Sequence, residues 1–229
     1  NLKGERAISY NLSADYYAKK YQFSINIFRT NLKDKIQFSP ADDEVKKFGY
    51  SYQWENVDDA YVQGVELGAK ANLFRNFNAG INWTFNQGKF KHERADWSDP
   101  NDETVKEFPQ RLQYAKDSRN ISRFPAMTGD IDLDYTPGTW TFSLTSSLQG
   151  RMFIDYNSED DGATSKIKKT NTFMIFNCRA AKRFGTCTVY AGAKNIFSYI
   201  QDEKHTDDAA FMYAPVYGAT WYVGLSVKL

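Results

Sequence analysis

The sequence predicts an all-β fold, an antiparallel transmembrane β-barrel segment of about nine strands. Three observations along the 229 residues predict it. Apolar and polar residues alternate through most of the chain, short and long connections alternate between the resulting runs, and aromatic residues gather at the ends of the runs. Sustained alternation of this kind indicates strands with one apolar and one polar face.

The alternation is clearest in a hairpin within residues 61–85, where Val65 and Leu67 share a face opposite Glu66 and Lys70. The pattern restarts after a tight break, so this segment predicts two long strands. The alternating runs in chain order are 6–17, 21–36, the two arms of this hairpin, 123–135, 140–155, 171–184, 187–196 and 217–229.

The connections between the runs predict which end of the sheet each turn occupies. Four are tight, at Ala18-Lys19-Lys20, Arg75-Asn76, Pro137-Gly138-Thr139 and Gly185-Thr186. Four are long, at about 37–57, 94–122, 157–170 and 198–215. Because the two kinds alternate without exception, we expect all tight turns at one end and all long loops at the other. Outer-membrane barrels have this asymmetry, whereas a soluble sandwich with Greek-key crossings has no reason for it.

The aromatic residues, 15 Tyr, 17 Phe and 5 Trp, lie where a membrane interface would place them. Those near the tight turns are Tyr16, Tyr17, Tyr21, Phe23, Phe74, Phe77, Tyr135, Trp140 and Phe184. Those near the long loops are Phe28, Trp83, Phe85, Phe90 and Phe153. Two aromatic girdles around an aliphatic band are typical of outer-membrane barrels. A general preference of aromatics for strands explains their number but not their position.

Composition excludes several classes of protein. The net charge of +1 gives no indication of a nucleic-acid partner. No window approaches 18 uninterrupted apolar residues, which excludes a transmembrane helix. A mean hydropathy of −0.62 suggests a soluble protein, but that index fails for barrels, since only every second residue of a transmembrane strand is apolar.

The two cysteines, Cys178 and Cys187, match no zinc spacing. A disulfide between them would need the intervening hairpin to turn at Lys182-Arg183. Gly185-Thr186 is the better two-residue turn, because glycine suits the first central position of a type II′ turn. On that register the cysteines sit at different heights and stay unpaired.

Charged residues on the polar faces predict a water-filled or plugged lumen. They would carry a large desolvation cost in a soluble core. The charged residues expected to face the lumen or a plug are Glu66, Lys70, Asp130, Asp132, Asp134, Arg151 and Arg179. The three aspartates would lie in a row about 7 Å apart along one strand, which suits lumen lining better than acid–base catalysis. Ser, His and Asp form no recognisable triad motif, and we expect no enzyme activity and no catalytic residue.

Aromatic residues of the loops are the candidate ligand-binding residues. They are Tyr50, Tyr52, Trp54, Trp97, Phe211 and Tyr213. Exposed aromatics beside charge suit apolar or planar ligands, and packing between loops is the alternative. His92 and His205 are the only histidines and could ligate haem iron, with solvated loop positions as the alternative. The run Glu159-Asp160-Asp161-Gly162 lacks the spacing of a calcium loop, so no resident metal or cofactor is expected.

Four segments resemble the TonB-dependent outer-membrane receptors. Asn1-Leu2-Lys3-Gly4-Glu5 is similar to the Asn-Leu-Lys-Pro-Glu that precedes a strand in that family, with Gly for Pro. The segment YVQGVELG at 61–68 resembles its Gly-x-Glu strand, and residues 192–197 resemble its Asn-Leu-Phe segment. Residues 221–229 resemble its final strand, although Leu229 replaces the usual terminal aromatic residue and 217–219 depart from the usual Pro-Gly-Arg.

The resemblance implies a larger protein, a barrel of about 22 strands with a plugged lumen. Residues 1–229 would be the C-terminal portion of that barrel, with the plug and the N-terminal strands outside this chain. The implied function is uptake of a scarce nutrient, an iron–siderophore, haem, cobalamin or oligosaccharide, across the outer membrane of a Gram-negative bacterium. The implied partners are the TonB complex acting through the plug, the rest of the barrel, the lipid bilayer and a surface lipoprotein over the loops.

Two other classes of protein fit parts of the pattern. One is a passive porin or an outer-membrane enzyme barrel, in which lumen charges set selectivity or a Ser-His pair in the wall hydrolyses lipid. An upstream plug would discriminate against it. The other is a soluble β-sandwich binding module, in which the aliphatic faces of two sheets would pack together instead of turning outward.

Overall fold

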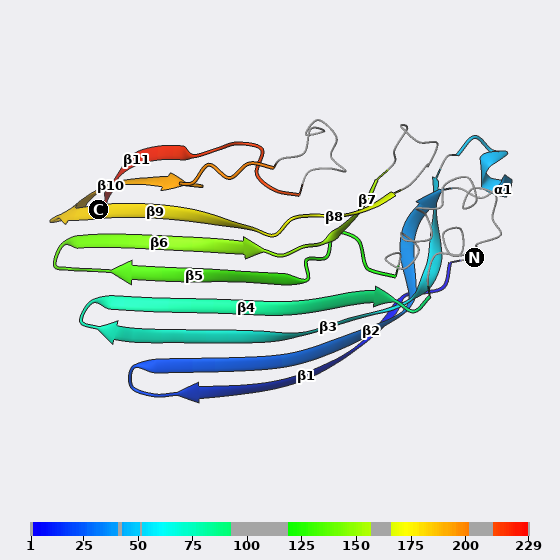
Figure 1. The fold of residues 1–229 in the computed structure, drawn as a ribbon, viewed down its shortest axis with the longest axis horizontal. Helices are drawn as coiled ribbons and strands as arrows, with labels where there is room; N and C mark the ends of the chain where they lie inside the picture. The colour runs from blue at the N-terminus through cyan, green and yellow to red at the C-terminus, as the bar shows by residue number, and fades with distance from the viewer. Residues whose placement is uncertain are drawn as a thin grey trace.

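The computed structural model describes residues 2–40, 43–50, 52–92, 119–156, 166–201 and 213–228. They form a nine-stranded sheet in the order β1-β2-β3-β4-β5-β6-β9-β10-β11 and a two-stranded sheet, β7-β8 (Figure 1). All the pairings are antiparallel, which confirms the predicted all-β fold. Among the described residues, no helix is long and apolar enough to cross a membrane.

The strands follow one another in the large sheet as a meander, with β7 and β8 inserted between β6 and β9. The elements are β1 Arg6–Tyr17, β2 Tyr21–Pro40, α1 Asp43–Lys46, β3 Tyr52–Phe74, β4 Phe77–Phe90, β5 Met127–Tyr135, β6 Trp140–Gln149, β7 Phe153–Tyr156, β8 Lys166–Lys169, β9 Phe173–Phe184, β10 Cys187–Lys194 and β11 Thr220–Val227.

The four tight turns lie together at one end of the sheet, at the left of Figure 1, as predicted. The strand ends that the longer connections join lie at the opposite end. Asn76, Gly138 and Gly185 have φ angles of 65°, 62° and 60°, the left-handed conformation that Asn and Gly tolerate. Because the last hairpin turns at Gly185, Cys187 pairs with Phe184, and both cysteines are free.

The strands β2 and β3 are longer than predicted. Residues 37–57 were expected to form a loop, but the ladder continues to the pair Pro40 and Tyr52. It passes through register shifts on both sides of Lys35, next to Asp34 with φ 54°. A bulge adds a residue to one strand and interrupts the alternation, so the regular pattern of 21–36 did not continue through it.

The predicted run 140–155 is two elements, because the chain leaves the sheet at Gly150. The Gly150 N–H donates to the Met127 carbonyl at 2.6 Å, and a Cβ on Gly150 would come within 2.8 Å of that oxygen. Beyond this bend Met152 is buried against Phe173. Similarly, the run expected from residue 123 forms a strand only from Met127 onward.

A small apolar cluster forms where the alternation of 171–184 is interrupted. It comprises Met152, Ile154, Phe173 and Tyr213, with Ile175, Tyr199 and Ala214 packed against it. Phe173 pairs with Gln149, so it belongs to the otherwise polar face of the sheet. The interruption therefore marks a packed patch at the loop end of that face.

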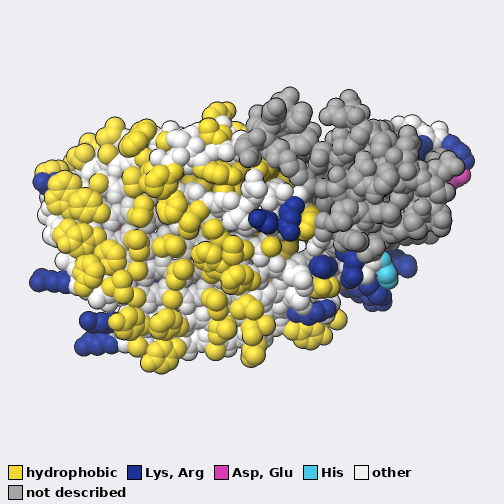
Figure 2. All heavy atoms as spheres, viewed as in Figure 1, with side chains coloured by type: hydrophobic (Ala, Val, Ile, Leu, Met, Phe, Trp, Pro, Cys, Tyr) yellow, Lys and Arg dark blue, Asp and Glu magenta, His cyan; other side chains and the backbone are white. Residues whose placement is uncertain are grey.

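The register confirms the two faces of the large sheet. One row across the strands joins Ile25, Leu67, Trp83, Gly129, Leu148 and Met174. The next row joins Asn26, Glu66, Thr84, Thr128 and Gln149. Leu67 is 42% exposed, and Figure 2 shows a broad surface of hydrophobic side chains. No second sheet covers this apolar face within the described residues, unlike the arrangement expected of a soluble sandwich.

Three of the aromatics expected in the girdles belong to the polar face, and one of them is Phe90, which pairs with Ala60. Phe28 pairs with Gly64, and a Cβ on Gly64 would lie 2.7 Å from the Phe28 ring. Tyr17 pairs with Gln22. The remaining tight-turn aromatics include a stack of Phe74 on Phe77, with ring centroids 4.7 Å apart.

Candidate functional site

The polar face carries a row of carboxylates on β5. Asp130, Asp132 and Asp134 alternate with the apolar residues of this strand. Asn82 donates to Asp130 at 2.8 Å, and the Ser143 hydroxyl donates to Asp134 at 2.6 Å. Each donor is neutral and occupies one carboxylate oxygen, so the row retains acceptor capacity for a further partner.

A mixed-charge groove of about 430 Å³ lies on the same face near the tight turns. It is lined by Tyr17, Gln22, Lys70, Asn78, Asp132 and Asp134, among others. Lys70 and Asp132 flank Gly80, since a Cβ there would lie 3.9 Å from each side chain. Because Gly80 has no side chain, the backbone of β4 between Lys70 and Asp132 is accessible to a polar chain segment bound in the groove.

Glu66 is the end of a hydrogen-bonded chain across three strands. The Ser13 hydroxyl donates to the Asn26 amide oxygen at 2.9 Å, and the Asn26 amide N–H donates to Glu66 at 2.9 Å. A carboxylate accepts several hydrogen bonds, so this network fixes the orientation of Glu66 and leaves acceptor capacity.

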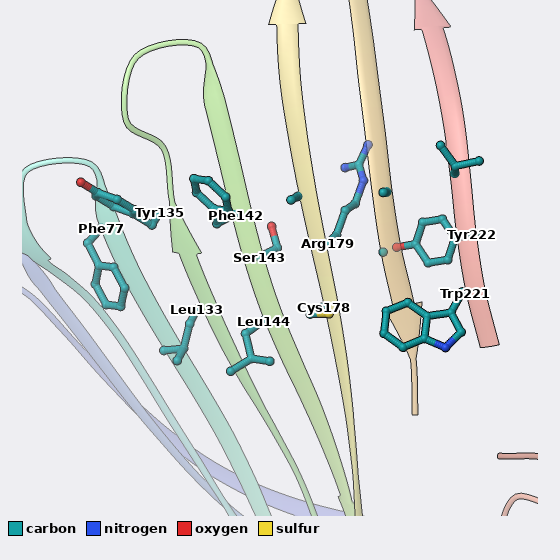
Figure 3. A pocket seen from close by; sticks show the side chains of 14 residues that line it. Phe77, Leu133, Tyr135, Phe142, Ser143, Leu144, Cys178, Arg179, Trp221 and Tyr222 are labelled. Carbon is teal, nitrogen blue, oxygen red and sulfur yellow. The ribbon is translucent and has the colours of Figure 1, made fainter. Parts of the chain in front are cut away.

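Arg179 on β9 lies beside a pair of tyrosine rings from β10 and β11. Its guanidinium lies 4.4 Å from the Tyr190 ring centroid, and Tyr190 meets Tyr222 edge-on at 6.3 Å. Figure 3 shows Tyr222 reaching from β11 across β10. The ring covers Gly192, and Tyr190 likewise covers Gly224 on β11. The two glycines therefore make room for rings that lie flat on the neighbouring strands.

Arg151 differs in placement from the other predicted lumen residues. It follows the end of β6 and is exposed, and its carbonyl accepts the Ala126 N–H at 2.9 Å. Because it lies outside the sheet ladder, strand parity does not assign it to either face. The register places Glu66, Lys70, Arg179 and the three aspartates of β5 together on the polar face.

Two hollows on the apolar face are lined mainly by apolar side chains. One of about 770 Å³ is lined by residues such as Leu133, Phe142, Leu144 and Trp221 (Figure 3). A ligand pocket combines an apolar lining with a few placed polar groups. These hollows are gaps between side chains that face outward from the sheet.

The predicted ligand-binding aromatics separate into three groups. Tyr50 and Trp54 are 66% and 62% exposed. Tyr213 is 8% exposed, and its N–H donates to the Gln201 side chain at 2.9 Å, which matches the packing alternative. Trp97 and Phe211 lie outside the described residues, as does the side chain of Tyr52.

His92, which follows β4, is hydrogen-bonded to Asp58 on β3. Its N–H donates to one Asp58 oxygen at 2.7 Å, and its Nδ1 lies 3.0 Å from the other. Burial raises the pKa of Asp58, but hydrogen bonds from His92 and from the Asp59 N–H together outweigh this effect. The pKa of Asp58 therefore lies below its ordinary value. Within the described residues no group of three His, Cys, Asp or Glu could hold a metal ion. His205 and residues 159–162 lie outside that part of the chain.

The family follows from a match along most of the chain. A family model described as TonB dependent receptor-like, beta-barrel, matches residues 1–196. The chain belongs to the TonB-dependent receptor family. The open nine-stranded sheet is therefore part of a receptor barrel, and the predicted resemblance is confirmed.

Solved structures with the same fold are longer than this receptor segment. The copper transporter OprC is 20% identical with a TM-score of 0.66, and the match covers 98% of this chain and 31% of that one. The ferric citrate transporter FecA is 20% identical with a TM-score of 0.66, over 96% of this chain and 31% of that one. The siderophore receptor PirA from Pseudomonas aeruginosa is 16% identical with a TM-score of 0.63, over 99% and 30%. The segment thus spans about a third of the length of these proteins.

Sequence reasoning found the polar face but missed the contacts that shape it. Parity along a strand predicted the aspartate row and Glu66. The rings lying on Gly64, Gly192 and Gly224 depend on which residue of the next strand stands opposite. The available signal was a glycine and an aromatic on facing strands, which requires the register to be known.

Proposed function

We propose that residues 1–229 form the C-terminal portion of the β-barrel of a TonB-dependent receptor in the outer membrane of a Gram-negative bacterium. The receptor takes up a scarce nutrient, an iron–siderophore, haem, cobalamin or oligosaccharide, with energy supplied through TonB. The observation that carries this proposal is a sheet with an uncovered apolar face and a charged polar face in a chain of this family.

The physical basis is the behaviour of strands in hydrocarbon. Every backbone N–H and C=O must be paired within the protein, and a closed barrel achieves this with strands. The face that includes Leu67 meets lipid, and the face that includes Glu66 meets the lumen. The sheet is open between β1 and β11 in the described residues, so the rest of the barrel closes it.

The polar face is proposed to hold the plug. The plug, which lies outside this chain, contacts the charged residues Glu66, Lys70, Asp130, Asp132, Asp134, Arg151 and Arg179. The TonB complex acts on this plug and not on the barrel wall. No reaction is catalysed, no cofactor is resident, and any iron, haem or cobalt complex is cargo.

The loop end is proposed to take the ligand. Exposed aromatics supply flat apolar surface at low entropic cost, which suits Tyr50 and Trp54. The other candidates are Tyr52, Trp97 and Phe211, and a surface lipoprotein is proposed to cover these loops. The names of the solved structures say copper, ferric citrate and siderophore of those proteins, and they favour a metal complex as cargo here.

An uptake experiment tests the proposal against the passive-barrel alternative. A strain that lacks the gene is grown with haem, a ferric siderophore, cobalamin or an oligosaccharide as the limiting nutrient. We expect loss of growth on one of them, restored by the full-length gene. Uptake of that labelled nutrient should stop when an uncoupler dissipates the proton gradient. Uptake that persists with the uncoupler would indicate a porin and contradict the proposal.

A further inference from the structure

The outer surface of β1–β4 changes character beyond the apolar band. In the row formed by Leu12, Ile27, Val65 and Phe85 all four residues are apolar. The next row toward the loop end joins Tyr10, Arg29, Gln63 and Gln87. Further rows on the same face include Tyr61 with Lys89, and Arg6 with Lys33. Figure 2 shows dark blue side chains on this border of the hydrophobic surface, with no magenta among them in that view.

Arg29 is held in a fixed position on this border. Its Nε–H donates to the Asn31 amide oxygen at 3.0 Å, and an Nη1–H donates to the Gln63 amide oxygen at 2.7 Å. The guanidinium also lies 4.5 Å from the Tyr61 ring centroid. A guanidinium has five N–H donors, so three remain after the two hydrogen bonds within the described residues. These suit the bidentate recognition of a phosphate.

Two further cations face each other without a carboxylate between them. Arg6 and Lys33 are direct partners in the β1–β2 ladder, and both are exposed. Like charges directly opposite each other destabilise an antiparallel pair. Of the nearby acids, Glu5 accepts the Ile36 N–H at 2.9 Å, and Asp59 accepts the Asp34 N–H at 3.1 Å and lies 3.9 Å from Lys91. A bound anion would remove the repulsion.

A hollow of about 510 Å³ connects this border to the apolar band. Its lining includes Leu12, Ile27 and Val65 on the apolar side, and Tyr10, Gln63 and Arg29 on the polar side. Acyl chains fit the first group and a phosphate-bearing headgroup fits the second. A single amphipathic ligand satisfies both parts of the hollow.

We propose that Arg6, Arg29, Lys33 and Lys89 form a binding site for the phosphate groups of an anionic lipid in the membrane leaflet on the loop side. This inference rests on the proposed outer-membrane function, since it requires the apolar face to meet lipid. The lipid anchors the loop end of β1–β4 at the level of its headgroups. The site lies on the opposite face from the residues proposed to hold the plug.

Native mass spectrometry of the full-length receptor in detergent tests the site. The probes are diphosphoryl lipid A and the same lipid with both phosphates removed. Each cation beside an anionic lipid surface is worth about a five-fold change in binding. We therefore expect Arg29→Gln to weaken binding of the diphosphoryl lipid about five-fold, and Arg6→Gln/Arg29→Gln/Lys33→Gln to weaken it about a hundred-fold.

Two matched variants control for charge in general. Lys182 faces the same side of the sheet at the tight-turn end, 4.8 Å from the Trp140 ring centroid, and Lys70 belongs to the polar face. Lys182→Gln and Lys70→Gln should leave binding of the diphosphoryl lipid unchanged. An unshifted thermal unfolding transition confirms that each variant is folded, since glutamine keeps much of the side-chain stem.

Besides unchanged lipid binding in Arg29→Gln and the triple variant, three results would overturn the proposal. They are equal binding of the phosphate-free lipid, an equal loss in Lys182→Gln, or displacement of the lipid by millimolar inorganic phosphate, which would indicate a site for free anions. Nutrient uptake by Arg29→Gln and by the triple variant is measured in parallel. Normal uptake together with unchanged lipid binding rejects only the lipid site, whereas absence of uptake in the unmodified receptor rejects the proposed function.

Discussion

At the scale of single residues, the assignment of faces rests on parity and is open to direct test. Leu67 stands between Ile25 and Trp83 on the apolar face, and Asn82 belongs to the polar face beside Asp130. Replacing Leu67 by Arg should destabilise the full-length barrel by about 2–4 kcal/mol, because an arginine near the bilayer midplane loses its hydration.

The matched variant is Asn82→Arg, whose new charge would lie in the lumen next to Asp130. We expect it to be tolerated, since it gains a carboxylate partner in place of the amide hydrogen bond of 2.8 Å. Urea titration of each barrel refolded into lipid vesicles measures the two effects. A similar loss of stability in both variants would show that the faces are assigned incorrectly.

The glycines under aromatic rings give a second residue-scale prediction. A Cβ on Gly224 would overlap the Tyr190 ring, whereas a Cβ on Gly80 would meet its nearest atoms at 3.9 Å. Gly224→Ala should cost about 1–3 kcal/mol through overpacking, and Gly80→Ala should cost much less. Adding Tyr190→Leu should recover most of the loss in Gly224→Ala. Additive effects in this double-mutant cycle, measured by urea unfolding, would contradict the contact.

At the scale of elements, the hydrogen bonds between Asp58 on β3 and His92, just after β4, should depend on pH. We call this contact the clasp and the parts of β3 and β4 that it joins the arm. The pKa of Asp58 is lowered by its hydrogen bonds from His92 and Asp59, against the opposing effect of burial. Because the folded pKa lies below the unfolded value of about 3.9, the clasp stabilises the arm above that pH. This stabilisation is lost as the pH falls through the folded pKa.

Amide hydrogen exchange measures this effect. After correction for the intrinsic rate, protection of the His92 N–H should fall below about pH 4, because that N–H donates to Asp58. Asp58→Ala should remove the protection at all pH values. Protection in the unmodified protein that stays constant from pH 6 to pH 3 would exclude the clasp.

The elements also show what local patterning can and cannot predict. Runs such as 6–17 and the turn at Gly185 were predictable, because alternation and turn chemistry are properties of neighbouring residues. The bend at Gly150 was not, since it depends on the distant partner Met127. The burial of Tyr213 likewise depends on Phe173, far away in the sequence. In the candidate site, parity predicted the aspartates, but it did not predict the rings that pack on glycines.

At the scale of the whole molecule, the open edges of the sheet are the main physical constraint. Within the described residues β1 pairs only with β2, and β11 pairs only with β10. An unpaired edge presents a row of N–H and C=O groups that can pair with another chain, and hydrocarbon offers these groups no alternative partner. The sheet is therefore stable as a monomer in a bilayer only when further strands cover both edges.

This constraint predicts how residues 1–229 behave when they are produced alone. Refolded into detergent micelles, the isolated segment should associate through β1 and β11, whereas the full-length receptor should remain a monomer under the same conditions. Light scattering after size-exclusion chromatography distinguishes the two states. The N–H groups of alternate residues such as Val223 face the open edge, because Lys228 and the residues in register with it bond to β10. Val223→Pro should therefore reduce association through β11, since proline has no N–H to donate. A monodisperse, folded monomer of the isolated segment would mean that its edges pair with each other, and that the barrel closes without further strands.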